Sequence, residues 1–188
     1  MAWKSSASHV PVLVLVAKLW QPKSILEVGA GQLSTSLFLD PAVFNLVDNL
    51  VSVESSTEWQ QRILSVHGTD PRLTLQSQLP IHGSSGFDLV FIDGPQDQEL
   101  RLHVIKTLSA NAKLLVIHDT EFEPYLDTAD RALAYRFTFS KRVPHTTILS
   151  TMAFDAIELH LRQEEINNNF NTFEEDWISW HKLFQGKN

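Results

Sequence analysis

A glycine-containing turn after a short apolar segment is the clearest candidate ligand site in this sequence. The segment spans residues 24–28 and carries Glu27, and Gly29 and Gly31 follow it. Glycine lets the backbone turn sharply and lets a ligand approach where a Cβ would stand in the way. A helix expected to start near Ser34 would direct its first N–H groups at the turn, where they attract an anionic group. The turn is therefore predicted to bind such a ligand, although a plain strand-to-helix turn has the same pattern.

The same turn argues against one common class of ligand. A dinucleotide fingerprint carries a third glycine, which lets the helix pack closely and leaves room for the pyrophosphate. That glycine would stand at position 34, which is Ser. The sequence therefore disfavours an NAD-dependent oxidoreductase, which would also need a separate substrate domain.

Polar residues follow several other apolar runs. Glu54, Asp93 and the pair His118-Asp119 each stand where such a run ends. Ligands of open α/β sheets bind outside the carboxyl ends of the strands, so we expect Asp93 and Asp119 on one rim. Side chains alternate along a strand, so His118 and Asp119 should not both face the crevice if that strand stays regular. Each of these residues also has a structural explanation, for example Asp93 as a cap of the next turn.

The elements that would position these residues follow from the apolar pattern. Short, continuous apolar runs predict strands covered on both faces at Ser24–Val28, Leu50–Val53, Leu73–Leu75, Phe87–Ile92 and Lys113–Ile117. Helical spacing occurs at Thr57–Val66 and Gln98–Leu108, and Tyr135–Ser140 and Thr146–Met152 are too close for a helical crossover. We therefore predict a doubly wound α/β fold, with a mostly parallel seven-stranded sheet, a C-terminal antiparallel hairpin and helices on both faces.

A single domain spanning 1–188 is predicted, with an N-terminal helix in 1–22, a core in 23–152 and a helical appendage in 153–188. The apolar run Val10–Trp20 has about half of the ~20 residues that a membrane span needs, which favours a buried helix. A helix is expected over Asp155–Asn167, and a capping box, Thr172 with Glu175, opens another. Its aromatic stripe, with Phe173, Trp177, Trp180 and Phe184, would pack on the core, form a homodimer contact or cover the substrate.

Composition excludes several kinds of chemistry. The chain has 22 acidic and 15 basic side chains, a net charge of −7 and no Lys/Arg-rich run, so nucleic acid is not an expected partner. It has no cysteine, which excludes disulfides, thiolate metal sites and cysteine nucleophiles. Its histidines, including His9, His67 and His103, show no metal-ligand spacing. We expect a cytoplasmic protein that does not act at a membrane.

Four segments in order carry a resemblance to a known family. Glu27-Val28-Gly29-Ala30-Gly31 resembles motif I of the class I S-adenosylmethionine-dependent methyltransferases, which have a Rossmann-like fold. Val51–Glu54, Phe87–Gly94 and Leu114–Thr120 resemble the ends of the family's second, fourth and fifth strands. The resemblance covers residues 23–152 and is greatest to small-molecule O-methyltransferases. The turn Asp93-Gly94-Pro95, followed by Arg101, is similar to a subgroup that acts on sugars and related hydroxyls.

The resemblance implies roles for particular residues. It implies that Glu54 binds the ribose hydroxyls of S-adenosylmethionine. The full set of cofactor-binding residues that it implies is Glu27, Gly29, Ala30, Gly31, Glu54, Ser55, Ser77 and Asp93. It implies Asp93, His118 and Asp119 as catalytic residues, with His118 as an orienting group or a base. Asp93 and Asp119 would hold Mg²⁺ or another divalent cation, together with water, in a metal-dependent member.

Two segments depart from the family pattern, and other functions stay open. Gln76-Ser77-Gln78 lacks the pattern that often contacts adenine, and Ala110-Asn111-Ala112 replaces the usual Pro-Gly-Gly. The expected activity is methyl transfer to a small-molecule acceptor, with a hydroxyl as the expected group. The alternatives are a non-catalytic module that binds S-adenosylmethionine or a nucleotide or serves in interactions, an NAD-dependent oxidoreductase, and an aminopropyl transferase, which would need a larger substrate-binding part.

Overall fold

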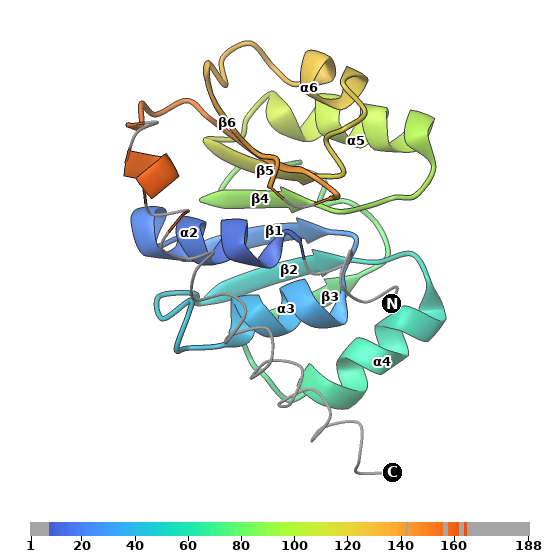
Figure 1. Cartoon of the computed structure of the whole chain (residues 1–188). Helices are drawn as coiled ribbons and strands as arrows, with labels where there is room; N and C mark the ends of the chain where they lie inside the picture. Colours follow the sequence, from blue (N-terminus) through green and yellow to red (C-terminus); the bar gives the residue numbers. More distant parts are fainter. Residues whose placement is uncertain (1–7, 142, 156–157, 162–163, 165–188) are drawn as a thin grey trace.

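A seven-stranded sheet forms the centre of the molecule (Figure 1). The computed structural model describes residues 8–141, 143–155, 158–161 and 164. The strand order is β3-β2-β1-β4-β5-β7-β6. Five strands are parallel, namely β1 (Ser24–Val28), β2 (Asn49–Val53), β3 (Leu73–Gln76), β4 (Leu89–Ile92) and β5 (Leu114–His118). The ends of all five strands differ from the predicted ends by at most two residues. The agreement is expected, because continuous apolar runs bounded by turns are typical of buried parallel strands.

The last two strands form the antiparallel part of the sheet. β6 (Tyr135–Phe139) pairs antiparallel with β7 (Thr146–Ser150), as the short connection between them predicts. β7 also pairs antiparallel with β5, so it lies between β5 and the edge strand β6.

Helices connect and cover the strands. Their bounds are α2 (Val10–Trp20), α3 (Gln32–Leu39), α4 (Thr57–His67), α5 (Gln98–Ser109) and α6 (Pro124–Thr128). Helix α3 begins at Gln32, two residues before the expected start, and Gly31 is its N-cap. The short α6 was not predicted, since five residues give too little helical periodicity to recognise.

The two faces of the sheet bury separate clusters of side chains. Leu89 and Phe91 of β4 pack with residues of α2 and α3, whereas Val90 and Ile92 pack with residues of α5 and α6. This alternation follows from the period of two along a strand. Helices therefore cover the sheet on both faces, and α2 lies against the sheet as the buried N-terminal helix expected from its apolar run (Figure 1).

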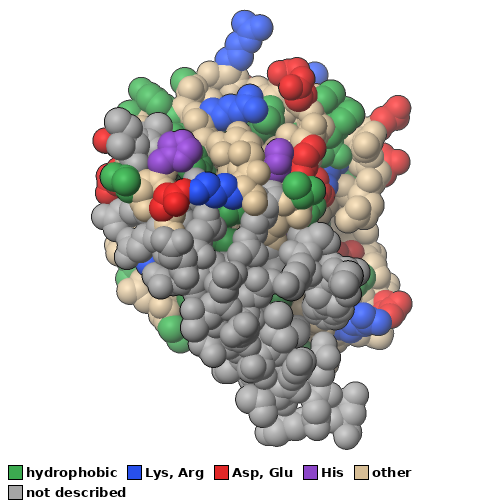
Figure 2. Space-filling view, in the orientation of Figure 1, with side chains coloured by type: hydrophobic (Ala, Val, Ile, Leu, Met, Phe, Trp, Pro, Cys, Tyr) green, Lys and Arg blue, Asp and Glu red, His purple; other side chains and the backbone are tan. Residues whose placement is uncertain are grey.

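The N- and C-terminal predictions are only partly within the described residues. None of the helices among those residues is long and apolar enough to cross a membrane. Residues 158–161 and 164 are helical, inside the range expected for the first appendage helix. The capping box at Thr172 and the aromatic stripe of the second helix lie outside the described residues. On the face in Figure 2, Lys and Arg side chains lie apart from one another rather than in one basic patch.

Candidate functional site

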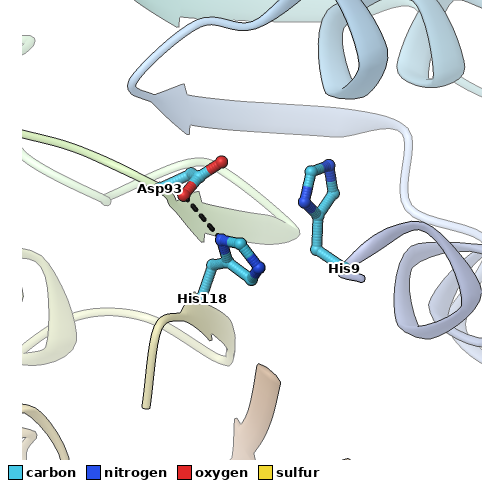
Figure 3. Close-up of side chains that lie close together, drawn as sticks. All are labelled: His9, Asp93 and His118. Carbon is cyan, nitrogen blue, oxygen red and sulfur yellow. Dashed lines mark hydrogen bonds and ion pairs between the residues drawn. The ribbon is translucent and has the colours of Figure 1, made fainter. Parts of the chain in front are cut away.

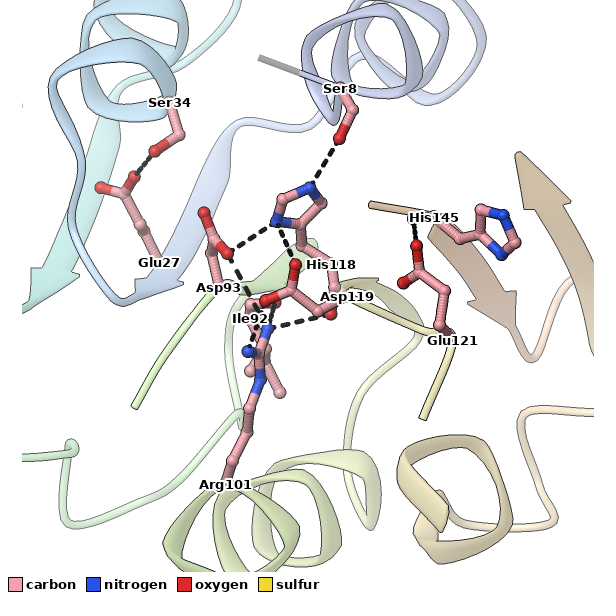
Figure 4. A network of polar contacts seen from close by, with 10 residues as sticks. All are labelled: Ser8, Glu27, Ser34, Ile92, Asp93, Arg101, His118, Asp119, Glu121 and His145. Carbon is pink, nitrogen blue, oxygen red and sulfur yellow. Dashed lines mark hydrogen bonds and ion pairs between the residues drawn. The ribbon is translucent and has the colours of Figure 1, made fainter. Parts of the chain in front are cut away.

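The carboxyl ends of β4 and β5 bring three predicted site residues together (Figure 4). Asp93 follows β4, His118 ends β5, and Asp119 comes next. The Nδ1 atom of His118 lies 2.8 Å from Oδ1 of Asp93 and 3.4 Å from Oδ1 of Asp119. The two carboxylates are therefore neighbours on the same rim of the sheet, as the sequence predicts.

The backbone at Asp119 explains how His118 and Asp119 can both lie beside Asp93. Asp119 has φ of 59°, in the left-handed region, which Asp adopts more readily than most residues. The strand therefore ends at His118, and the simple alternation of side chains no longer applies at Asp119. The expectation that His118 and Asp119 would not both face this site applied to a strand that stays regular through Asp119. The strand ends at His118, so the expectation does not apply.

Arg101 contacts residues at the ends of both β4 and β5, a role that was not predicted from the sequence. Its side chain is 2% exposed and comes from α5. Nη1 donates to Oδ2 of Asp119 at 2.9 Å, and Nη2 donates to the carbonyl of His118 at 2.9 Å. Nη2 also lies 3.8 Å from Oδ1 of Asp93, and the guanidinium lies over the ring of Tyr125. Its spacing of three, four and seven residues before Val104, Ile105 and Leu108 places Arg101 on the apolar face of α5, and this was the sequence signal that could have identified it.

The charges of this cluster shift the pKa values of His118 and Asp93 in opposite directions. Burial by itself would lower the pKa of His118, but the hydrogen bond to Asp93 and the charges of Asp93 and Asp119 hold it above its usual value. Burial by itself would raise the pKa of Asp93, but the hydrogen bond and charge of His118, helped by Arg101, hold it below its usual value. Asp93 is therefore ionised at neutral pH and accepts the Nδ1–H of His118.

Two residues that precede α2 complete the cluster. Oγ of Ser8 lies 2.8 Å from Nε2 of His118, across 110 positions of sequence. The ring of His9 meets the ring of His118 edge-on with centroids 4.9 Å apart, and it is 5.3 Å from the ring of Phe91. His9 was not expected at this site, and no local pattern places it there, because its position depends on how α2 packs on the sheet.

Glu27 is buried beneath the glycine turn rather than exposed in it. Its carboxylate accepts hydrogen bonds from the hydroxyls of Ser34 at 2.5 Å, Thr35 at 2.8 Å and Ser52 at 2.5 Å. Burial raises the pKa of Glu27 to about 7, although these hydrogen bonds oppose the shift. These contacts tie Glu27 to α3 and β2, and its expected role in cofactor binding stays a prediction.

The two glycines of the turn, Gly29 and Gly31, differ in backbone conformation and in the space beside them. Gly29 has φ of +85°, and a Cβ there would lie 2.6 Å from the backbone nitrogen of Gly94. Gly29 therefore allows the turn to pack directly on the loop after β4. At Gly31 a Cβ would meet only Oγ of Ser34, at 3.4 Å, so this position has room on its Cβ side. The need for glycine at 29 comes from the fold, and only Gly31 has space that a ligand would share.

Glu54 lies next to this turn. The N–H groups of Gly29 and Ala30 both donate to the carbonyl of Val53, at 2.9 and 3.2 Å, which fixes the turn beside the end of β2. Oε1 of Glu54 accepts from the N–H of Ser56 at 2.7 Å, and Oε2 has no hydrogen bond among the described residues. Ser55 and Ser77 are exposed where the chain leaves β2 and β3, close to the same rim.

The expected cation pair, Asp93 and Asp119, can be tested against the contacts it makes. Mg²⁺ needs several oxygen ligands in near-octahedral geometry. Here Arg101 already contacts Asp119 and lies close to Asp93, so its positive charge stands where a hard cation would be needed. The residues of this pair do not fit Mg²⁺ in this arrangement.

Solved structures of other proteins share this fold. The O-methyltransferase TomG from Streptomyces achromogenes, in complex with SAM, aligns with a TM-score of 0.52 at 15% identity, over 80% of this chain and 89% of that one. The ribosomal protein L11 methylase from Lactobacillus delbrueckii aligns with a TM-score of 0.56 at 15% identity, over 77% and 78%. A spermidine synthase aligns with a TM-score of 0.54 at 14% identity, over 83% of this chain and 60% of that one.

Sequence comparisons add nothing to these structural matches, since neither a family model nor a curated protein matches the chain. The strand order, the antiparallel β7 and the glycine turn after β1 agree with the resemblance noted in the sequence. From its sequence motifs and its structural matches together, this chain has the fold of the class I S-adenosylmethionine-dependent methyltransferases.

Proposed function

We propose that this protein binds S-adenosylmethionine at the carboxyl ends of β1, β2 and β4 and transfers its methyl group to a hydroxyl of a small molecule. The observation that carries the proposal is the attachment of the glycine turn to Val53, the residue before Glu54. It keeps a carboxylate oxygen of Glu54 that has no hydrogen bond among the described residues beside a turn with space at Gly31.

The N-terminus of α3 supports the cofactor proposal. Its N-cap is Gly31, which supplies no side-chain cap for the first N–H groups of the helix. The N–H groups at a helix start bind carboxylates, and S-adenosylmethionine carries one on its methionine part. Glu54 would accept hydrogen bonds from the ribose hydroxyls at the other end of the cofactor.

The cluster of Asp93 and His118 supports transfer to a hydroxyl. Asp93 accepts Nδ1–H and so directs the lone pair of His118 Nε2 away from itself, toward Ser8. An acceptor hydroxyl in the place of the Ser8 hydroxyl would give its proton to Nε2 while its oxygen forms a bond to the methyl carbon. The methyl–sulfur bond breaks with its electron pair going to sulfur, which leaves S-adenosylhomocysteine.

Two observations bear on the competing functions. Position 34, where a dinucleotide site would need glycine, is a buried Ser bonded to Glu27. The match to the spermidine synthase, at 14% identity over 60% of that chain, concerns the fold and does not favour aminopropyl transfer. A non-catalytic binding module keeps the same cofactor site and differs only in turnover.

Calorimetry with S-adenosylmethionine, S-adenosylhomocysteine and NAD tests the cofactor proposal. We expect both sulfur compounds to bind one per chain, and NAD to bind at least about 100-fold more weakly, a difference of roughly 3 kcal/mol. Tight NAD binding, or no binding of S-adenosylhomocysteine by folded protein, would contradict it.

A library of hydroxylated small molecules, assayed for S-adenosylhomocysteine release, tests methyl transfer itself. We expect release with at least one class of hydroxyl compound. Cofactor binding without release on any compound would favour the non-catalytic module.

A further inference from the structure

We propose that His9, Asp93 and His118 form a binding site for a divalent transition-metal ion such as Zn²⁺ or Co²⁺. The three side chains converge from the start of α2, the end of β4 and the end of β5 (Figure 3). Each offers one ligand atom, and these atoms all lie within 4.8 Å of one another. Two atoms bound to one Zn²⁺ at ~2.1 Å lie up to roughly 4 Å apart, so small shifts would bring all three onto an ion.

His9 is the residue that requires an explanation. It is 3% exposed, and neither Nδ1 nor Nε2 has a hydrogen-bond partner among the described residues. An imidazole that is buried with no partner loses its hydration without compensation, which destabilises the fold. The fold could fill this position with an aromatic side chain, since His9 packs on Phe91 as an aromatic ring would. A bound metal would satisfy a nitrogen that the described part of the chain leaves unpaired.

The donors determine which metals fit. Two imidazoles and one carboxylate are the ligands of many zinc sites with an open position, and of iron(II) sites. Mg²⁺ prefers oxygen ligands and would be bound poorly by this set. The site is therefore distinct from the expected Asp93–Asp119 pair: Arg101 donates a hydrogen bond to Asp119, whereas its Nη2 lies 3.8 Å from Oδ1 of Asp93, beyond hydrogen-bond distance.

The surroundings can accommodate a metal at His118. His118 uses Nδ1 toward Asp93 and Nε2 toward Ser8, so it must give up one of these two hydrogen bonds to bind the ion. The other nitrogen can keep a hydrogen bond that orients the ring, as histidine ligands commonly do. The nitrogen that binds the ion cannot also accept a proton, so ion binding and the base role proposed above are alternatives at that nitrogen.

Titration of the tag-free, chelator-treated full chain with Co²⁺ tests the site, with visible absorption as the readout. We expect one Co²⁺ per chain, displaced by Zn²⁺ and not by millimolar Mg²⁺. The variant His9→Phe keeps the ring and removes both nitrogens, and we expect at least 100-fold weaker Co²⁺ binding. The matched control is His103→Phe, on the exposed surface of α5, which should bind Co²⁺ like the unsubstituted protein.

Stability measurements and X-ray absorption keep the test decisive. Without metal, His9→Phe should unfold at the same or higher temperature than the unsubstituted protein, since it removes unpaired buried nitrogens. X-ray absorption on the Zn²⁺-loaded unsubstituted chain should count two imidazole ligands, whether or not the variant folds. No binding by folded protein, equal Co²⁺ affinity in His9→Phe, or fewer than two imidazoles would each overturn the proposal. Calorimetry of the metal-free chain with S-adenosylhomocysteine tests the proposed function separately, so failure of the metal proposal can be told apart from failure of the cofactor proposal.

Discussion

Glu27 in β1 and Glu54 directly after β2 both lie near the glycine turn, yet their surroundings give them different roles. Glu54 keeps one carboxylate oxygen free of hydrogen bonds among the described residues. Glu27 accepts hydrogen bonds from three buried hydroxyls and from the backbone of Gly31. We therefore expect substitutions of Glu54 to affect ligand affinity, and substitutions of Glu27 to affect stability.

Glu54→Ala should weaken binding of S-adenosylhomocysteine at least tenfold, with little change in folding. Hydrogen bonds to a charged group contribute roughly 1.5–3 kcal/mol each, and the variant removes those to the ribose. Calorimetry measures the affinity, and Glu58→Ala, on the exposed start of α4, is the control that should bind normally. An unchanged dissociation constant in folded Glu54→Ala would show that the ribose site is elsewhere.

Glu27 should make the stability of the protein depend on pH. Its pKa is about 7 in the folded state against 4.5 for the ordinary side chain, so the folded protein binds a proton that the unfolded chain releases. The free energy of unfolding should therefore fall as pH rises from about 4.5 to 7, by roughly 3 kcal/mol from this group.

Urea unfolding of the unsubstituted protein and of Glu27→Gln at pH 5 and pH 8 measures this effect. The free energy of unfolding of the unsubstituted protein should fall between pH 5 and pH 8 by the contribution of Glu27, whereas Glu27→Gln lacks this contribution because Gln does not titrate. The unsubstituted protein should therefore be more stable relative to Glu27→Gln at pH 5 than at pH 8. Glu58→Gln, at the exposed start of α4, keeps Glu27 and should therefore lose stability between pH 5 and pH 8 as the unsubstituted protein does. A difference that is constant from pH 5 to pH 8 would mean that Glu27 stays ionised in the fold.

Among the elements, the β1–α3 turn holds one glycine that the packing requires and one whose Cβ side has room for a ligand. Gly29→Ala should reduce the free energy of unfolding by about 1–3 kcal/mol, because φ of +85° and the contact with Gly94 both oppose a side chain. Gly31→Ala should cost under about 1 kcal/mol, since its Cβ would meet only Ser34 and its φ of −131° suits any residue.

Gly31→Leu extends this comparison to the ligand. Its unfolding free energy should stay near that of Gly31→Ala, while its affinity for S-adenosylhomocysteine falls at least tenfold, because the larger side chain fills the space that the cofactor would take. Chemical unfolding and calorimetry on the same samples separate the two effects. Normal binding by Gly31→Leu would contradict the position proposed for the cofactor.

At the scale of the whole molecule, the aromatic stripe at Phe173, Trp177, Trp180 and Phe184 remains a prediction. The sequence leaves open whether this stripe packs on the core, covers the substrate or joins two copies of the chain, and a dimer would bury its apolar side chains between the copies. Suppose the stripe joins two copies. Sedimentation of the full chain at tens of micromolar should then give a dimer, and Trp177→Asp with Trp180→Asp should give a folded monomer. A monomeric unsubstituted chain would favour packing of the stripe on its own core.

Most of the sheet, the glycine turn and the rim where the acids lie could be predicted from the sequence. Strands are encoded by apolar runs of four to six residues, and turns by Gly, Pro and Asp within a few positions, so both can be recognised locally. The neighbouring positions of Asp93 and Asp119 followed from a general property of parallel sheets, whose strands end on the same side.

The side chains that contact His118 could not be predicted from the sequence, because these contacts depend on how the helices pack on the sheet. Ser8 contacts it across 110 positions, and His9 reaches the same cluster only because α2 packs on the sheet. Arg101 reaches Asp119 because α5 covers the other face. Such contacts depend on the packing of whole helices, which no local periodicity encodes, and the left-handed backbone of Asp119 likewise depends on where the chain leaves the sheet.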